Sequence, residues 1–218
     1  MDRRPGGGQR IPRPDAWTLG EDAAPATHPL IATVDDLADR LRDAPVGRPI
    51  APAFPGARPS AVLVALADGA NGAEVLLTRR SEHLRNHRGE MSFPGGRIDP
   101  GETPLEAALR EADEEVGLDP SEVTVIGELA HLNTVVSRSY IVPIVARLPA
   151  PLELSPASPE VERILWVALG EFVRPNTYRA ERWGQHPTDR LLHFFELDDE
   201  TVWGATATML VDLFTRLA

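Results

Sequence analysis

One segment, residues 96–118 (GRIDPGETPLEAALREADEEVGL), constrains what this chain can fold into more than any other. It begins with glycine and acidic residues and continues into a pattern typical of a helix start. Thr103 is suited to the N-cap, the proline after it to the first helical position, and Glu106 completes a T-x-x-E capping box. Gly117 suits the left-handed residue that closes a helix. The sequence therefore predicts a helix over Pro104–Val116 whose two ends are set locally.

This helix carries a cluster of carboxylates. Glu111, Glu114 and Glu115 follow one another at i, i+3 and i+4, so they lie close together on its surface. Like charges at this spacing destabilise a bare helix by about 0.2–0.5 kcal/mol per pair, and a magnesium ion bound to carboxylate oxygens removes that cost. A solvated acidic face is the alternative interpretation. One apolar stripe is expected to be buried: Leu105, Leu109, Ala112 and Val116.

The spacing of the fixed residues favours the metal site. It resembles the Nudix box, G-x5-E-x7-R-E-U-x-E-E-x-G-U, and every fixed position from Gly96 to Leu118 is filled, with the small residue Ala112 in one apolar slot. The resemblance implies an α/β fold of the Nudix type, an α/β/α sandwich with a mixed sheet. It also implies a hydrolase that splits a nucleoside diphosphate linked to another moiety.

The resemblance assigns roles to residues of the box. It implies that Mg²⁺ or Mn²⁺ is bound by Glu111, Glu114 and Glu115, with the main-chain carbonyl of Gly95 as a further ligand. A structural pair, Glu102 and Arg110, is expected to hold the loop onto the helix. Among the carboxylates, Glu111 is preferred as the group that orients or deprotonates the attacking water. Glu114 or an acid outside the box is the alternative.

A second motif lies directly upstream. Four arginines and two histidines fall within residues 79–88 of an otherwise acidic chain. They form either a surface loop with local salt bridges to Glu82 and Glu90 or a clamp for an anion, which the planar arginine side chain suits. The pattern L-L-T-x-R-S-x3-R-x3-G-x3-F-P-G-G over residues 76–96 is similar to the signature of the coenzyme A pyrophosphatase branch of the Nudix family.

That similarity implies a substrate. The expected reaction is hydrolysis of the diphosphate of coenzyme A or acyl-CoA to 3′,5′-ADP and 4′-phosphopantetheine or its acyl form. The expected substrate-binding residues are Arg80, Ser81, Arg85 and Gly96. One alternative is a Nudix hydrolase of ADP-ribose, NADH or a damaged nucleotide. The other is a Nudix-fold binding module without catalysis, although such modules usually lack some of the box carboxylates that are all present here.

Composition limits the remaining function classes. The formal net charge of −11 over 218 residues argues against nucleic acid or an anionic membrane as a partner, because phosphate groups require a basic surface. The chain has no cysteine, which excludes disulfides and thiolate chemistry. No apolar run approaches the ~20 residues of a membrane span. The expected partner is a small nucleotide and the expected location is the cytoplasm; no pattern specifies an oligomeric state.

The order of elements predicts one domain with an N-terminal arm. Residues 1–29 are rich in proline, glycine and charge, and we expect a disordered arm in which Trp17 is either docked or exposed. Residues 30–218 are expected to form the Nudix domain, with further helices at 34–41 and 205–217. The predicted strands are 61–67, 74–79, 91–93, 123–130, 140–148, 164–169 and 193–197. Residues 48–60, 152–159 and 174–190 are expected to be irregular, and the last two to overhang a site.

Overall fold

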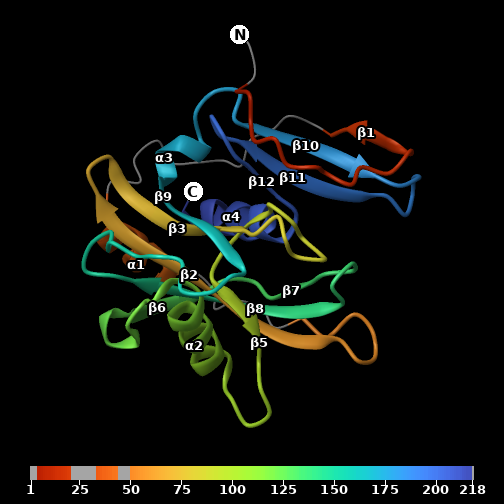
Figure 1. Ribbon diagram of the computed structural model, residues 1–218. Helices are drawn as coiled ribbons and strands as arrows, with labels where there is room; N and C mark the ends of the chain where they lie inside the picture. The colour runs from red at the N-terminus through yellow and green to blue at the C-terminus, as the bar shows by residue number, and fades with distance from the viewer. Residues whose placement is uncertain (1–3, 21–32, 44–49, 218) are drawn as a thin grey trace.

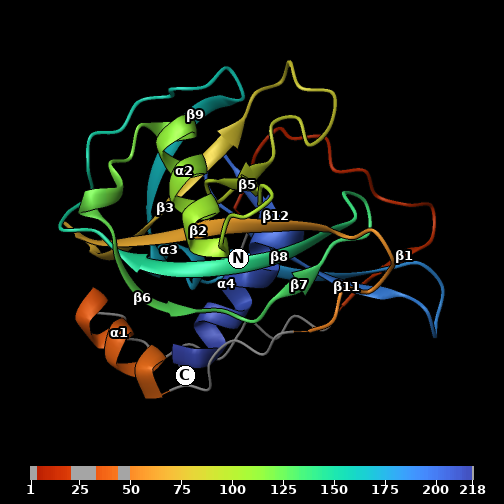
Figure 2. The same ribbon diagram turned by 90° about the horizontal axis from the view of Figure 1, so that it is seen from below.

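The computed structural model describes residues 4–20, 33–43 and 50–217, and it contains two β-sheets and four α-helices among them (Figure 1). Helix α2 (Pro104–Val116) covers one face of the larger sheet, while α1 (Val34–Asp43) and α4 (Gly204–Leu217) cover the other (Figure 2). This arrangement confirms the predicted α/β/α fold with a mixed sheet. None of the helices in these residues is long and apolar enough to cross a membrane.

The larger sheet is organised around β2, which pairs with β3 and β5 in antiparallel and with β8 in parallel orientation. Every residue from Leu63 to Ala67 is buried, as the continuous apolar run predicts for a strand covered on both faces. The strands of this sheet are β2 (Arg58–Gly69), β3 (Gly72–Arg80), β4 (Met91–Ser92), β5 (Gly95–Arg97), β6 (Thr124–Glu128), β7 (Leu132–Asn133), β8 (Ser139–Arg147) and β9 (Val161–Ala168).

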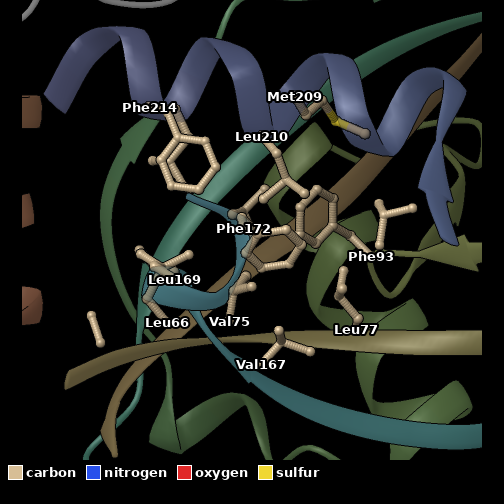
Figure 3. Close-up of a cluster of buried hydrophobic side chains, with 14 of the residues drawn as sticks. Leu66, Val75, Leu77, Phe93, Val167, Leu169, Phe172, Met209, Leu210 and Phe214 are labelled. Carbon is tan, nitrogen blue, oxygen red and sulfur yellow. The ribbon is translucent and has the colours of Figure 1, made fainter. Parts of the chain in front are cut away.

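The main core lies between this sheet and α4. Figure 3 shows side chains of β2, β3 and β9 facing Met209, Leu210 and Phe214 of α4, with Phe93 and Phe172 between them. Phe172 belongs to the short helix α3 (Leu169–Phe172), which the sequence does not predict. A second cluster lies under α2 and is lined mainly by alanine on the helix side. The small side chains allow α2 to pack close to β2 and β5.

The smaller sheet differs from the sequence-based expectation. Residues 174–190 were expected to be irregular, yet they contain β10 (Tyr178–Trp183), which pairs with β11 (Arg190–Glu196). The strand is not recognisable from the sequence because several of its residues are polar. In the structure these residues are buried and paired: Arg179 bonds to both Glu181 and Glu196. Strand β12 (Thr201–Trp203) completes the pairing beside β11, and the sheet packs against α4.

The prediction of a disordered arm is wrong for residues 4–20. Trp17–Leu19 forms β1, which pairs with β10 at the edge of the smaller sheet. Trp17 is therefore held by its backbone, and its ring is partly exposed below the guanidinium of Arg13 at 4.6 Å. Residues 21–29 of the predicted arm lie outside the described residues.

Polar contacts explain why a segment with little apolar content is ordered. Arg13 makes two hydrogen bonds of 2.7 Å to the carboxylate of Glu181, which is 1% exposed. Arg4 bonds to Asp198 at 3.0 Å, and Gln9 bonds to the buried Glu200 at 2.7 Å. Each anchor joins residues more than 165 positions apart, so a local reading of the sequence cannot find it.

Deleting residues 1–20 is therefore expected to destabilise the protein. Glu181 and Glu200 would each lose a hydrogen-bonding partner while remaining in the sheet, and the free energy of unfolding should fall by at least about 2 kcal/mol. Denaturant titration of the truncated and full-length proteins measures this loss. Arg13→Ala should reproduce part of it, while Arg10→Ala, at an exposed position on the same segment, should have little effect. Equal stability of the truncated and full-length proteins would contradict the docking.

Candidate functional site

The central helix α2 begins and ends where the sequence predicts. The hydroxyl of Thr103 accepts a hydrogen bond from the amide of Glu106 at 3.2 Å, and the Glu106 carboxylate accepts one from the amide of Thr103 at 2.8 Å. Gly117 closes the helix in the left-handed conformation, with φ of 69°. These local caps fix the register of the helix and hence the positions of its three glutamates.

The buried face of α2 is rotated from the predicted stripe. Leu105 and Leu109 are only partly buried, while Glu115 is 7% exposed and lies on the face turned toward the sheet. The fully buried residues are Ala107, Ala108, Ala112 and Val116. Because alanines form the contact, the helix approaches β2 and β5 closely and brings one carboxylate into the interior.

Two glycines between β2 and α2 make this close packing possible. At Gly95, φ is +153°, and a Cβ atom would lie 2.6 Å from the Cα of Val62. At Gly96, a Cβ atom would lie 2.5 Å from Oε2 of Glu111. Larger residues would therefore push the loop away from β2 or displace the Glu111 carboxylate.

Arg110 joins the loop to the helix. Its Nε donates to Oε1 of Glu102 at 2.8 Å, so the predicted structural pair is present, and its Nη2 donates to the carbonyl of Arg97 at 3.0 Å. Nη1 bonds to Glu111 at 2.9 Å and to Glu114 at 3.2 Å. The hydrogen bond to Glu102, with a further one to Glu111, raises the pKa of Arg110, so this side chain stays charged.

Glu115 is the most buried acid of the site. Burial raises the pKa of its carboxyl group to about 7, and the amide of Gly95, which donates to Oε2 at 3.2 Å, only partly offsets this effect. Nη1 of Arg80 lies 4.0 Å from Oε1. A carboxylate held in the interior with so few partners fits a cation ligand, because a bound cation would compensate the cost of burying its charge.

The other two acids of the box are more accessible. Burial also raises the pKa of Glu111, whereas the Glu114 side chain is 58% exposed. Among the described residues, no three histidine, aspartate or glutamate side chains are already arranged to hold a metal ion. Nη1 of Arg110 lies within hydrogen-bonding distance of both Glu111 and Glu114. The donor set matches a hard divalent cation, and each of these two carboxylates has one oxygen that Arg110 does not contact.

The residues of the upstream motif are placed in different environments. Arg80 reaches the box, Ser81 is buried and accepts a hydrogen bond from the amide of His83 at 3.3 Å, and Arg85 is exposed. Arg85 makes no ion pair with any residue in the described part of the chain. The local salt bridges to Glu82 and Glu90 are also present, made by Arg79 at 3.0 Å and by His87 at 2.8 Å. The structure thus uses some cations of this loop internally and leaves others exposed.

A further acid belongs to the site. Oε2 of Glu160, directly before β9, lies 3.0 Å from Nη2 of Arg80, and its charge helps to raise the pKa values of Glu111 and Glu115. The predicted irregular segment that precedes it contacts α2, since the amide of Ala157 donates to the carbonyl of Glu115 at 3.0 Å. Sequence reasoning does not assign Glu160 to the site, because nothing in its local sequence indicates proximity to the box.

Comparisons with known proteins find several relatives of this chain. Residues 57–191 match the family model described as NUDIX domain. A protein of Photorhabdus laumondii described as "Uncharacterized Nudix hydrolase NudL" is 40% identical over 141 residues, which cover 64% of this chain and 74% of the relative. The protein of the same description from Yersinia pestis is 36% identical over 145 residues, covering 66% and 72%. A MutT/nudix family structure from Enterococcus faecalis shares the fold, with a TM-score of 0.50, 15% identity and coverage of 84% and 73%.

Gly95→Ala tests the close packing of the loop. The substitution adds a Cβ atom against the β2 backbone at a φ that side chains rarely adopt, and it should lower the free energy of unfolding by roughly 1–3 kcal/mol. Thermal or denaturant unfolding measures the change. Gly170→Ala is the matched control, because its Cβ would meet no atom within 4 Å. Equal effects of the two substitutions would show that the loop is not tightly packed.

Proposed function

The chain belongs to the NUDIX domain family, and on that premise we propose that it is a metal-dependent hydrolase of nucleoside diphosphate derivatives whose substrate is coenzyme A or acyl-CoA. The observation that carries the proposal is the arrangement of three box glutamates on α2 against a glycine loop, with Arg80 of the upstream motif 4.0 Å from Glu115. The two sequence motifs thus meet at one place in the fold. The cytoplasmic location remains a prediction.

The proposed metal is Mg²⁺ or Mn²⁺. Glu111, Glu114 and Glu115 would hold it, and the carbonyl of Gly95 is proposed as a further ligand. When bound, such a cation neutralises the diphosphate and lowers the pKa of a coordinated water. The buried carboxylate of Glu115 supports this assignment, since its partners are one backbone amide at 3.2 Å and the guanidinium of Arg80 at 4.0 Å, which is beyond hydrogen-bonding distance.

Side chains of the box are proposed to activate the water and to keep the loop in place. Glu111 is proposed to orient or deprotonate the water that attacks phosphorus in line, because it lies against Gly96 and is held on one oxygen by Arg110. Arg110 would thereby orient Glu111 while its bonds to Glu102 and the Arg97 carbonyl keep the loop in place. Glu114, exposed on the same side of Arg110, is the alternative to Glu111 in this role.

The exposed cations of the upstream loop are proposed to select the substrate. Coenzyme A differs from dephospho-coenzyme A by a ribose 3′-phosphate that is remote from the diphosphate. Arg85 is exposed and makes no ion pair with the described residues, so it can take a phosphate without breaking an existing pair. Arg80 lies nearer the box and is proposed to contact the diphosphate, with Ser81 and Gly96 shaping the loop around it.

The direct test of the reaction is turnover of a substrate panel. Coenzyme A, acetyl-CoA, dephospho-coenzyme A, ADP-ribose and NADH are compared with Mg²⁺ or Mn²⁺, and the products are separated by chromatography. Coenzyme A and its acyl form should give the highest kcat/KM, with 3′,5′-ADP as the common product. Preference for ADP-ribose or NADH would replace the proposed substrate. Loss of turnover for every substrate, with intact nucleotide binding, would favour a binding module.

Glu111→Gln should leave the fold intact and lower turnover by at least about 10²–10³-fold, because a charge and a proton acceptor are lost at the reacting centre. Steady-state kinetics at saturating metal measures the change, and circular dichroism checks the fold. Asp113→Asn, on the exposed face of the same helix, is the matched control and should keep turnover within about twofold. Near wild-type turnover of folded Glu111→Gln protein would refute the assigned role.

Arg85→Ala should reduce kcat/KM for coenzyme A by roughly 10- to 150-fold, the loss expected for one hydrogen bond to a charged group. The effect should appear in KM rather than in kcat, because the 3′-phosphate is bound equally before and during the reaction. Dephospho-coenzyme A, which lacks that group, should be almost unaffected. An equal loss for both substrates would mean that Arg85 braces the loop. Arg42→Ala, on an exposed part of α1, serves as the control for general loss of charge.

A further inference from the structure

Glu160 is fixed by its backbone beside the two motifs of the site. Its carbonyl accepts a hydrogen bond from the amide of Ser81 at 2.8 Å, which ties it to the end of β3. Three residues earlier, the amide of Ala157 donates to the carbonyl of Glu115 on α2 at 3.0 Å. The segment before β9 therefore holds Glu160 at a defined position between the strand that carries Arg80 and the helix that carries the box.

Arg80 lies between two carboxylates. Its Nη2 bonds to Glu160 at 3.0 Å, while its Nη1 is 4.0 Å from Oε1 of Glu115. Its Nε is buried and has no hydrogen-bond partner among the described residues. The guanidinium is thus hydrogen-bonded to Glu160 at one end and lies at the outer limit of an ion pair with Glu115 at the other, so loss of Glu160 would free it to turn onto Glu115.

Such a rotation would have consequences for the site. Glu115 is buried, and an arginine paired with it there would neutralise the carboxylate and cover the oxygen proposed to bind the metal. The Glu160 side chain is 52% exposed, so its pair with Arg80 forms with little loss of hydration. Glu160 can therefore form an ion pair with Arg80 without placing a second buried charge in the site.

We propose that Glu160 is a positioning residue that holds Arg80 away from Glu115 and so keeps the Glu115 carboxylate free to bind the metal. This inference rests on the proposed function only in taking Glu115 as a metal ligand. It gives Arg80 a defined position in the absence of substrate, from which it can turn to a phosphate. It also gives the segment before β9 a role in metal binding without making Glu160 itself a ligand.

The test measures Mn²⁺ binding directly, without substrate, by the loss of the free-ion electron paramagnetic resonance signal. Glu160→Gln should weaken binding by about fivefold, which corresponds to about 1 kcal/mol, as Arg80 moves onto Glu115. Glu160→Ala is a second variant with the same expected result. Glu162→Gln is the matched control, because Glu162 is similarly exposed and lies two residues further along, yet it faces Arg79, at 4.0 Å, instead of Arg80. It should bind Mn²⁺ like the wild type.

A double-mutant cycle separates this role from direct ligation. If Glu160 acts through Arg80, then Glu160→Gln should change Mn²⁺ affinity by less than about twofold when Arg80→Gln is already present. An equal loss in both backgrounds would make Glu160 a ligand and overturn the proposal, as would unchanged affinity of Glu160→Gln alone. Failure of the proposed function gives a different result: the wild type would bind Mn²⁺ no better than Glu115→Gln.

Discussion

The close contact of Gly95 and Gly96 with β2 on one side and α2 on the other determines the geometry of the site. Because neither glycine has a side chain, the loop lies against the β2 backbone, and Glu111 and Glu115 lie against the loop. The alanine face of α2 also contributes to the close packing, since its small side chains let the helix approach the sheet. A buried carboxylate at Glu115 follows from these two constraints together.

Arginine–glutamate pairs then determine which carboxylates of the site are held in ion pairs and which remain available to bind a cation. Glu102 is used by Arg110 to hold the loop, and Glu160 is used by Arg80 at the other end of the site. Glu115 is left with one hydrogen bond, from a backbone amide, and with Arg80 at 4.0 Å. In a chain with 33 acidic and 22 basic residues, the arrangement of the arginines is thus as informative as that of the acids. The proposed chemistry depends on this division of carboxylates.

How much of the structure the sequence predicts depends on how local the determining interactions are. Each end of α2 is set by contacts between residues at most five positions apart, so its bounds can be predicted from the sequence, and the apolar run of β2 identifies a strand covered on both faces. The formation of β10 depends on Arg179 and Glu181, whose charges are compensated by partners elsewhere in the fold. The place of Glu160 depends on the approach of β9 to β3, which no spacing within the sequence encodes. Capping motifs and hydrophobic periodicity in the sequence do not predict such tertiary contacts.

The docking of residues 4–20 onto the smaller sheet has a consequence for the order of folding. The segment's partners lie in β10, in β12 and in the turn between β11 and β12, so its binding surface does not exist until residue 201 has been synthesised. Closing so long a loop carries a large entropic cost, and contacts of this separation form slowly. During synthesis β1 must therefore wait for β10, and until the two pair, the edge of β10 and the carboxylate of Glu181 lack their partners in residues 4–20. Any early encounter of β10 with another strand would compete with β1 for that edge.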